Sequence, residues 1–233
     1  KGAKHLKVCW VLDLVNMASF SAKAEYRTLK KVMVHTPGYE SFLGTLDPNA
    51  NLFIKGFSVI KAQKEHQLLM DTLRGEGIKA YLLKDLVAKH PRFDMAVLES
   101  VDVSQYDQGE RFYLIDNLMS MDDDSKFRAI LLNPRLSRKE VLKRMGGEAS
   151  FIMNRIPLAN MYFQRDQQFL GDKGFILSRM AKPSRKKEPR ITKLALESLG
   201  ANIQYEVKKP DAIEGGEFMP LGEFALIGTR YYD

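Results

Sequence analysis

The chain has 233 residues, of which 45% are hydrophobic and 28% are charged, an ordinary globular composition. Its apolar runs are far shorter than the ~20 residues of a membrane-spanning helix, and Asp13 interrupts the run "VCWVLDLV". The single cysteine, Cys9, excludes an internal disulfide and favours a reducing compartment. We therefore expect a soluble, cytoplasmic protein that does not bind a membrane.

The net charge of +7 is concentrated in two basic clusters, at residues 133–147 and 180–193. A basic surface is a common feature of nucleic-acid-binding proteins, but it is also common on solvated helix faces. Neither cluster is interleaved with aromatic residues on which bases could stack. Nucleic-acid binding is therefore not predicted, and it stays an alternative that a salt-dependent affinity would reveal.

Two stretches share one plan of predicted elements. Apolar residues at helical spacing cover residues 59–73 and 191–199, and each run is followed by glycine and a short β-rich segment, 78–83 or 203–207. Probable strands precede each helix: "LKKVMVH" the first, and "MYFQRD" with "GFILSRM" the second. Repeated strand–strand–helix–strand units indicate an α/β fold.

The segment between the two units, about residues 85–147, loses this β character and is predicted to be a helical insertion. The motif "LSRKEVL" is a typical helix start, because Ser137 could cap, Glu140 could reach back and Leu136 could pack on Val141. Residues 1–24 form an N-terminal extension of unknown role. We expect residues 25–233 to form one domain with this excursion.

Two short acidic motifs are candidates for a binding site. Asp166 follows Arg165 in "NMYFQRDQQF", and Glu214 precedes two glycines in "IEGGEF". Taken singly, each has a plain explanation: an Arg–Asp pair that closes a turn, and a bulge residue bonded to backbone. Together, two carboxylates from different repeats can converge on a planar guanidinium or amidinium, and the glycines would let backbone lie close to it.

These motifs carry a family resemblance. "IPLANMYFQRDQQF", "KPSRKKE" and "IEGGEFMPLGEFALIG" resemble, in this order, the arginine deiminase branch of the guanidine-modifying (pentein) superfamily, and most of all its protist and archaeal type. "LKKVMVHTPGYESFLGTLDPNANL" and "KAQKEHQLLMDTLRGEGIKAYLLKDL" resemble the first blade of that family. The resemblance extends from about Tyr26 to Gly228.

The resemblance implies a partial pentein-type β/α propeller of ββαβ units with a helical insertion. It implies hydrolysis of L-arginine to L-citrulline and ammonia, without metal or cofactor. Asp166 and Glu214 would clamp the substrate guanidinium. The other positions that match substrate-binding residues of the family are Asn160 and Phe163 in the pocket, Arg185 at the substrate carboxylate, and Leu46 on a closing loop.

The chain departs from the family pattern near its C-terminal end. The family's cysteine nucleophile and His-x-Asp motif follow the Glu-Gly-Gly, whereas this chain ends at Asp233 and its histidines lie early. Arg230 stands two residues before the family's carboxylate-binding arginine. It is either a displaced equivalent, or the natural chain ends differently. A shortened deiminase with open sheet edges would favour pairing between copies.

Several functions therefore stay open. The first is an arginine deiminase-type hydrolase, with agmatine, dimethylarginine or amidine transfer as variants of substrate or reaction. The second is a catalytically inactive protein that binds arginine through the carboxylate clamp. Arginine calorimetry combined with a citrulline assay would separate the two.

Overall fold

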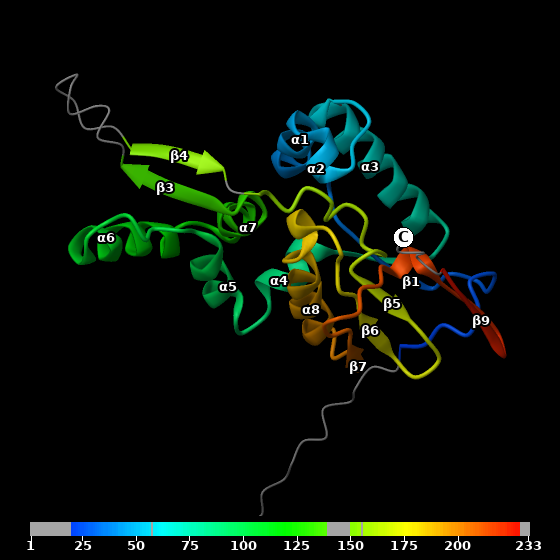
Figure 1. The fold of residues 1–233 in the computed structure, drawn as a ribbon. Coiled ribbons are helices and arrows are strands. Elements are labelled where there is room, and N and C mark those ends of the chain that lie inside the picture. The colour runs from blue at the N-terminus through cyan, green and yellow to red at the C-terminus, as the bar shows by residue number, and fades with distance from the viewer. Residues whose placement is uncertain (1–19, 57, 139–149, 155, 229–233) are drawn as a thin grey trace, which may run out of the picture.

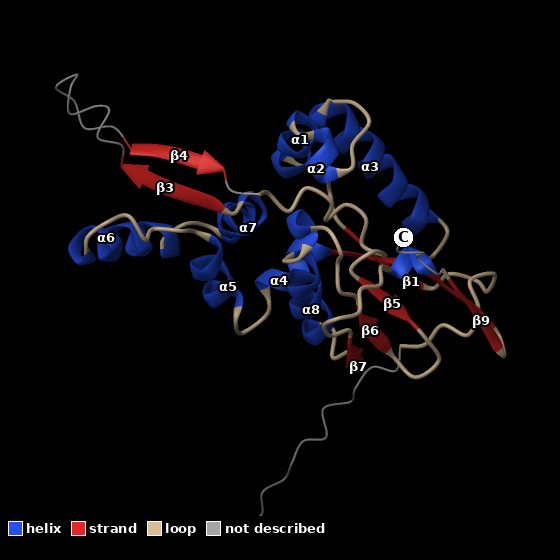
Figure 2. Cartoon of the chain, in the orientation of Figure 1, coloured by secondary structure: helices blue, strands red, loops and turns tan. Residues whose placement is uncertain are grey.

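A computed structural model describes residues 20–56, 58–138, 150–154 and 156–228. It shows a mixed α/β protein in which helices pack against several small sheets, so the predicted α/β class is confirmed (Figure 2). Among the described residues, no helix combines the length and apolarity needed to cross a membrane.

The first repeat is a β–α–β unit near the N-terminal end of the described chain. Its elements are β1 (Lys31–Val34), α1 (Tyr39–Leu46), α2 (Pro48–Asn51), α3 (Val59–Gly75) and β2 (Lys79–Leu82). Strands β1 and β2 pair in parallel, with Val32 opposite Ala80. Helix α3 begins at Ser58, whose side chain accepts a hydrogen bond from the Lys61 amide. The predicted helix 59–73 and strand 78–83 are confirmed.

The second repeat contains the predicted ββαβ order. Its elements are β5 (Gln168–Leu170), β6 (Phe175–Leu177), the 3-10 turn η2 (Pro183–Arg185), α8 (Glu188–Ser198) and β7 (Ile203–Glu206). Strand β6 pairs antiparallel with β5 and parallel with β7. The predicted strand at "MYFQRD" is wrong, because residues 161–166 form turns before β5 begins.

The segment between the repeats contains mainly helices. They are α4 (Leu83–Ala88), α5 (Phe93–Ser100), α6 (Gln108–Met119) and α7 (Asp123–Leu132). The hairpin of β3 (Pro134–Arg138) and β4 (Ser150–Asn154) follows, and Figure 1 shows it with α6 at one end of the molecule. The predicted helix start at Ser137 is wrong, because Ser137 lies in β3 opposite Phe151. Strand pairing has overridden the local capping signal.

The main hydrophobic core lies where α4, α5, α7 and α8 meet. Its fully buried side chains include Leu83, Val97, Ile130 and Ala195, and Met161 from the turn before β5 joins them. A smaller cluster packs Phe175 of β6 against Leu196 on another face of α8. Helix α8 therefore connects the two cores, and its N-terminal end is fixed beside the turn of residues 160–167.

The described chain ends in a hairpin preceded by a single helical turn. Its elements are η3 (Gly215–Glu217), β8 (Phe218–Leu221) and β9 (Phe224–Ile227). Gly222 has a φ of +87° in the hairpin turn, a conformation that favours glycine. The turn η3 brings the "IEGGEF" motif against the start of β5.

Candidate functional site: a buried guanidinium held by carboxylates

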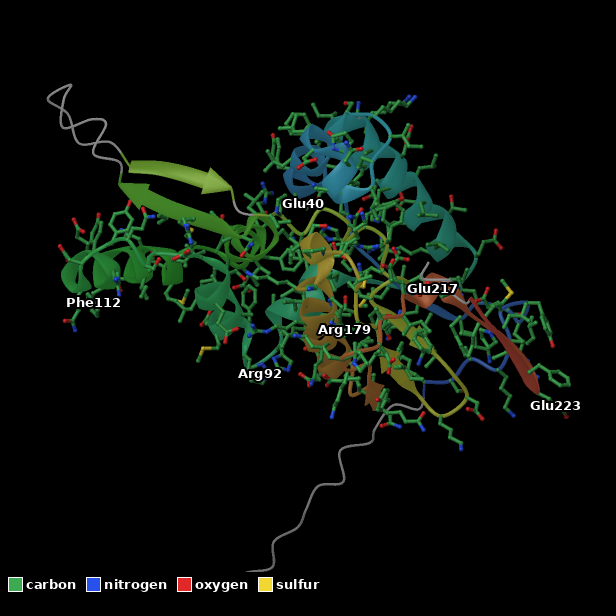
Figure 3. All side chains as sticks on the ribbon, in the orientation of Figure 1. Glu40, Arg92, Phe112, Arg179, Glu217 and Glu223 are labelled. Atoms are coloured by element: carbon green, nitrogen blue, oxygen red, sulfur yellow. The ribbon has the colours of Figure 1, made fainter. Side chains whose placement is uncertain are left out.

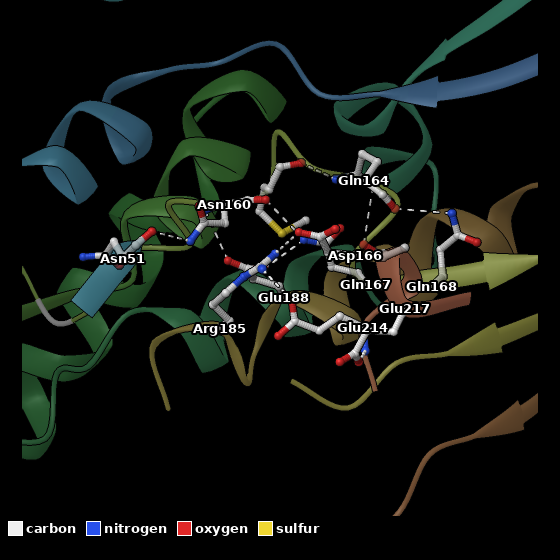
Figure 4. A network of polar contacts seen from close by, with 12 residues as sticks. Asn51, Asn160, Gln164, Asp166, Gln167, Gln168, Arg185, Glu188, Glu214 and Glu217 are labelled. Atoms are coloured by element: carbon white, nitrogen blue, oxygen red, sulfur yellow. Dashed lines mark hydrogen bonds and ion pairs between the residues drawn. The ribbon is translucent and has the colours of Figure 1, made fainter. Parts of the chain in front are cut away.

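Arg185 lies at the centre of a cluster of acidic side chains, although Lys186 and Lys187, which follow it in the sequence, are exposed. Its side chain is 4% exposed. Its Nε donates to Glu188 Oε2 at 3.0 Å and its Nη1 donates to Glu214 Oε2 at 3.1 Å. Its Nη2 lies 3.0 Å from Asp166 Oδ2, as an ion pair that is not aligned as a hydrogen bond. Figure 4 shows this arrangement.

The two acids singled out from the sequence, Asp166 and Glu214, therefore bind the same guanidinium. They belong to different segments, the turn before β5 and the start of η3. Their side chains keep some solvent access, 24% for Asp166 and 17% for Glu214. Arg185 fills the space between them, so the described structure contains a guanidinium–carboxylate cluster formed entirely by the chain itself.

Gly215 explains how these segments come together. The Gly215 amide donates to the Asp166 carbonyl at 3.1 Å, and Arg165 Nε donates to the Gly215 carbonyl at 3.1 Å. A Cβ on Gly215 would lie 1.9 Å from the Arg165 carbonyl oxygen. Only glycine permits this approach of two backbones, and the approach sets Glu214 beside Asp166.

Glu188 also belongs to the cluster and is almost completely buried. Its Oε1 accepts from the Asn160 amide at 3.2 Å, and its Oε2 accepts from Gln167 Nε2 at 2.9 Å as well as from Arg185. All three partners are donors, which suits a carboxylate. Burial nevertheless raises the pKa of Glu188 above its ordinary 4.5, against the opposing effects of Arg185 and Gln167.

Asn160 is buried and holds the first repeat against the cluster. Its Nδ2 donates to the Asn51 carbonyl of α2 at 3.0 Å, and its own carbonyl accepts from Gln167 Nε2 at 3.2 Å. Ser184 of η2 makes a parallel contact, since its hydroxyl donates to the Ala50 carbonyl at 2.7 Å. The segment around α2 is thus fixed next to Arg185.

The remaining predicted site residues occupy different positions. Phe163 is 48% exposed and contacts the edge of Tyr162, with ring centroids 5.5 Å apart. Leu46 ends α1 and is 67% exposed, so it does not contribute to the core. Arg230 lies outside the described residues, as does Cys9.

Two members of the cluster, Glu188 and Gln167, were not predicted from the sequence. Glu188 is three residues after Arg185, a spacing at which side chains on a helical turn meet, and the following Pro189 marks the helix start. That spacing was a usable signal. Gln167 gave none, since an amide in a polar run is normally solvated.

The three histidines within the described residues have partners of their own. His35 Nε2 lies 3.1 Å from Glu40 Oε1, His66 Nδ1 lies 3.3 Å from the Thr36 hydroxyl, and His90 Nε2 lies 3.0 Å from Glu197. Burial raises the pKa of Glu40, but the hydrogen bond and charge of His35 and the nearby amides outweigh it, so that the net pKa is lowered. Burial and the charge of His35 lower the pKa of His66.

The fold and this cluster together define an α/β protein with a guanidinium bound by converging carboxylates. Residues 51–230 match the family model described as "Arginine deiminase". The chain belongs to the arginine deiminase family.

Curated relatives agree with the family model. The chain is 28% identical to an arginine deiminase of Halobacterium salinarum, over 89% of this chain and 51% of that protein. It is 24% identical to arginine deiminases of Listeria monocytogenes and Oenococcus oeni, over 88% and 91% of this chain and 53% and 56% of theirs. The chain therefore spans about half the length of the curated relatives that it matches.

Proposed function

We propose that the chain is the guanidinium-binding part of an arginine deiminase-type hydrolase, which converts L-arginine and water to L-citrulline and ammonia. The observation that carries the proposal is the shared guanidinium: Asp166 and Glu214 both bind Arg185, and both keep contact with solvent. Carboxylates already placed for one planar cation are placed for another of the same shape.

For substrate to enter this clamp, the Nη groups of Arg185 would leave it. Glu188 would keep its hold on Nε, so the side chain would stay attached at its base. The contact with Asp166 is the weakest of the three, since it lacks an aligned hydrogen bond. A guanidinium turned outward in this way would be free to meet the substrate carboxylate, the role that the family resemblance assigns to Arg185.

Asn160 and Phe163 take supporting roles in this proposal. Asn160 is held on three sides by polar contacts and would fix the pocket wall. Phe163 presents an exposed ring two residues before Arg165 and would cover the aliphatic part of the substrate. Leu46, exposed at the end of α1, would close over the amino-acid end of the substrate. Arg230, as a displaced equivalent of the family's arginine, would bind the substrate carboxylate.

The proposed architecture is a partial pentein-type propeller. The β5–β6–α8–β7 unit supports it, because it has the ββαβ order of one blade. The helical insertion, about residues 85–147, would follow the first blade. Exposed apolar residues on β9, Phe224 and Leu226 among them, would favour pairing between copies. A cytoplasmic location stays our prediction.

A second candidate is an arginine-binding protein without catalytic activity. It is favoured by the histidines His35, His66 and His90, which are bound to other partners within the described chain. Deimination needs a thiolate to attack the guanidinium carbon and a base to activate water. Binding of arginine without formation of citrulline would support this candidate.

The test is calorimetry with L-arginine and agmatine, combined with a citrulline assay. Asp166→Asn and Glu214→Gln should each weaken arginine binding by at least tenfold, because each removes one charge-assisted pair. Asp94→Asn is the matched control: Asp94 of α5 pairs with Lys126 of α7 and not with a residue of the cluster, so its loss should leave binding unchanged. Unchanged arginine affinity in both clamp variants would show that the cluster is structural only.

A further inference from the structure

A cavity of about 510 Å³ lies at the carboxyl ends of β6 and β7, beside the first turns of α8. Its described walls include neither Asp166 nor Glu214. Six cationic side chains and one carboxylate, Glu206, line it; the cations are Arg92, Arg179, Lys186, Arg190, Lys193 and Lys209. Several belong to the basic cluster of residues 180–193, which the guanidinium clamp does not explain. Figure 3 labels Arg92 and Arg179.

Ser178 is the second observation at this cavity. It follows β6 directly, is 5% exposed and forms part of the wall. Its amide donates to the Gln167 carbonyl at 3.0 Å, but its hydroxyl has no hydrogen-bond partner among the described residues. A buried hydroxyl without a partner is uncommon and calls for a missing partner, such as a ligand.

The positive charge of the cavity is only partly neutralised. Arg92 pairs with Glu197, Lys193 pairs with Glu206, and Arg190 pairs with Glu99. Arg179, by contrast, donates from Nη1 to two backbone carbonyls, at 3.2 Å and 2.5 Å, which fix the guanidinium without cancelling its charge. Within the described chain, Lys186 and Lys209 show no ion pair.

We propose that this cavity binds a small, multiply charged phosphate anion such as pyrophosphate or a phosphate monoester. The carboxyl ends of parallel strands and the start of a helix are where α/β folds bind phosphates, and α8 adds its positive N-terminal end. The volume is within the range of small-molecule sites. The described walls contain no aromatic ring, so they offer no surface for stacking of bases. This proposal does not depend on the guanidinium clamp.

The test is titration calorimetry of the chain with pyrophosphate. Ser178→Ala should weaken binding by about tenfold, because the hydroxyl would donate to a charged oxygen. The double variant Lys186→Ala with Lys209→Ala should weaken it at least as much. Lys61→Ala with Lys64→Ala removes the same charge from the exposed face of α3 and should leave the affinity unchanged. Circular dichroism would verify that each variant folds.

Several results would overturn the proposal. One is a wild-type chain that does not bind pyrophosphate. Another is an equal loss in the two double variants, which would mean that pyrophosphate responds only to net charge. Unchanged pyrophosphate affinity in Ser178→Ala would show that the buried hydroxyl does not contact the anion, and the assignment of the anion to this cavity would then be wrong. Preferential binding of a single-stranded oligonucleotide, competing with pyrophosphate, would indicate a nucleic-acid surface instead.

Discussion

Replacement of Gly215 by alanine should break the contact that places the two carboxylates together. The new Cβ would lie 1.9 Å from the Arg165 carbonyl oxygen and 2.4 Å from that of Gln168. The first distance is about 1.5 Å shorter than the 3.4 Å at which ordinary contact begins. Both oxygens belong to the backbone, so no side-chain rotation can relieve the overlap, and one segment must move away from the other.

The expected cost follows from what that movement breaks. Two hydrogen bonds connect Gly215 to the turn, one to the Asp166 carbonyl and one from Arg165, and each contributes about 1 kcal/mol. Overpacking adds about 1–3 kcal/mol. The reduced entropy of the unfolded chain offsets up to about 1 kcal/mol. The free energy of unfolding should therefore fall by about 3 kcal/mol, and Glu214 should lose its position beside Asp166.

Urea denaturation followed by circular dichroism measures the stability change, and calorimetry with arginine measures the effect on binding. Gly216→Ala is a control at the next residue, because the nearest atom to its new Cβ is Asp166 Oδ1, at 3.9 Å. We expect this control to stay within about 0.5 kcal/mol of the wild type. Equal stability of Gly215→Ala and Gly216→Ala would refute the argument that backbone approach at Gly215 assembles the cluster.

Three further predictions concern buried charges. Arg185→Lys should lower the free energy of unfolding by about 3 kcal/mol in urea denaturation, because one ammonium cannot replace the planar fork that meets three carboxylates. Burial raises the pKa of Glu188, so its stabilising contribution is present below about pH 4.5 and falls as pH rises through the raised pKa. The stability difference between wild type and Glu188→Gln should therefore shrink as the pH rises above about 4.5. A difference that instead grows with rising pH would show that the charge of Arg185 outweighs burial. The pKa of Glu40 is lowered on balance, because His35 outweighs burial, so the pH dependence has the opposite sign. Glu40 stabilises the fold above about pH 4.5, and this stabilisation is lost on acidification. Glu40→Gln should therefore lower the free energy of unfolding more at about pH 7 than at about pH 3.

The regular helices and strands could be predicted because their signals are local. Helices α3 and α8 have apolar residues at helical spacing and are followed by glycine, and the strands after them are short and apolar. The wrong predictions lie where contacts between residues far apart in the sequence determine the local structure. Tyr162 and Phe163 suggest a strand, yet buried contacts of Asn160 and Met161 hold this segment in turns. Ser137 suggests a helix cap, yet it pairs with Phe151 in a hairpin.

The site was predictable only in part, for a physical reason. The convergence of Asp166 and Glu214 could be inferred from their types, the glycines and the family resemblance. That Arg185 would lie between them could not, because a basic run normally remains solvated and the spacing to Glu188 indicates only a local pair. The burial of Glu188 determines which arginine is buried, since a carboxylate with almost no exposure favours a cationic partner.

The charge balance of the cluster connects its stability to its proposed function. Asp166, Glu188 and Glu214 face one guanidinium, so the cluster holds more negative than positive charge when all three acids are ionised. Burial relieves part of this surplus by raising the pKa of Glu188. A second guanidinium at the solvent-exposed side of Asp166 and Glu214 would relieve the rest without displacing Arg185 from Glu188. A cluster arranged in this way would be stable without a ligand, and its remaining negative charge would still attract a cationic one.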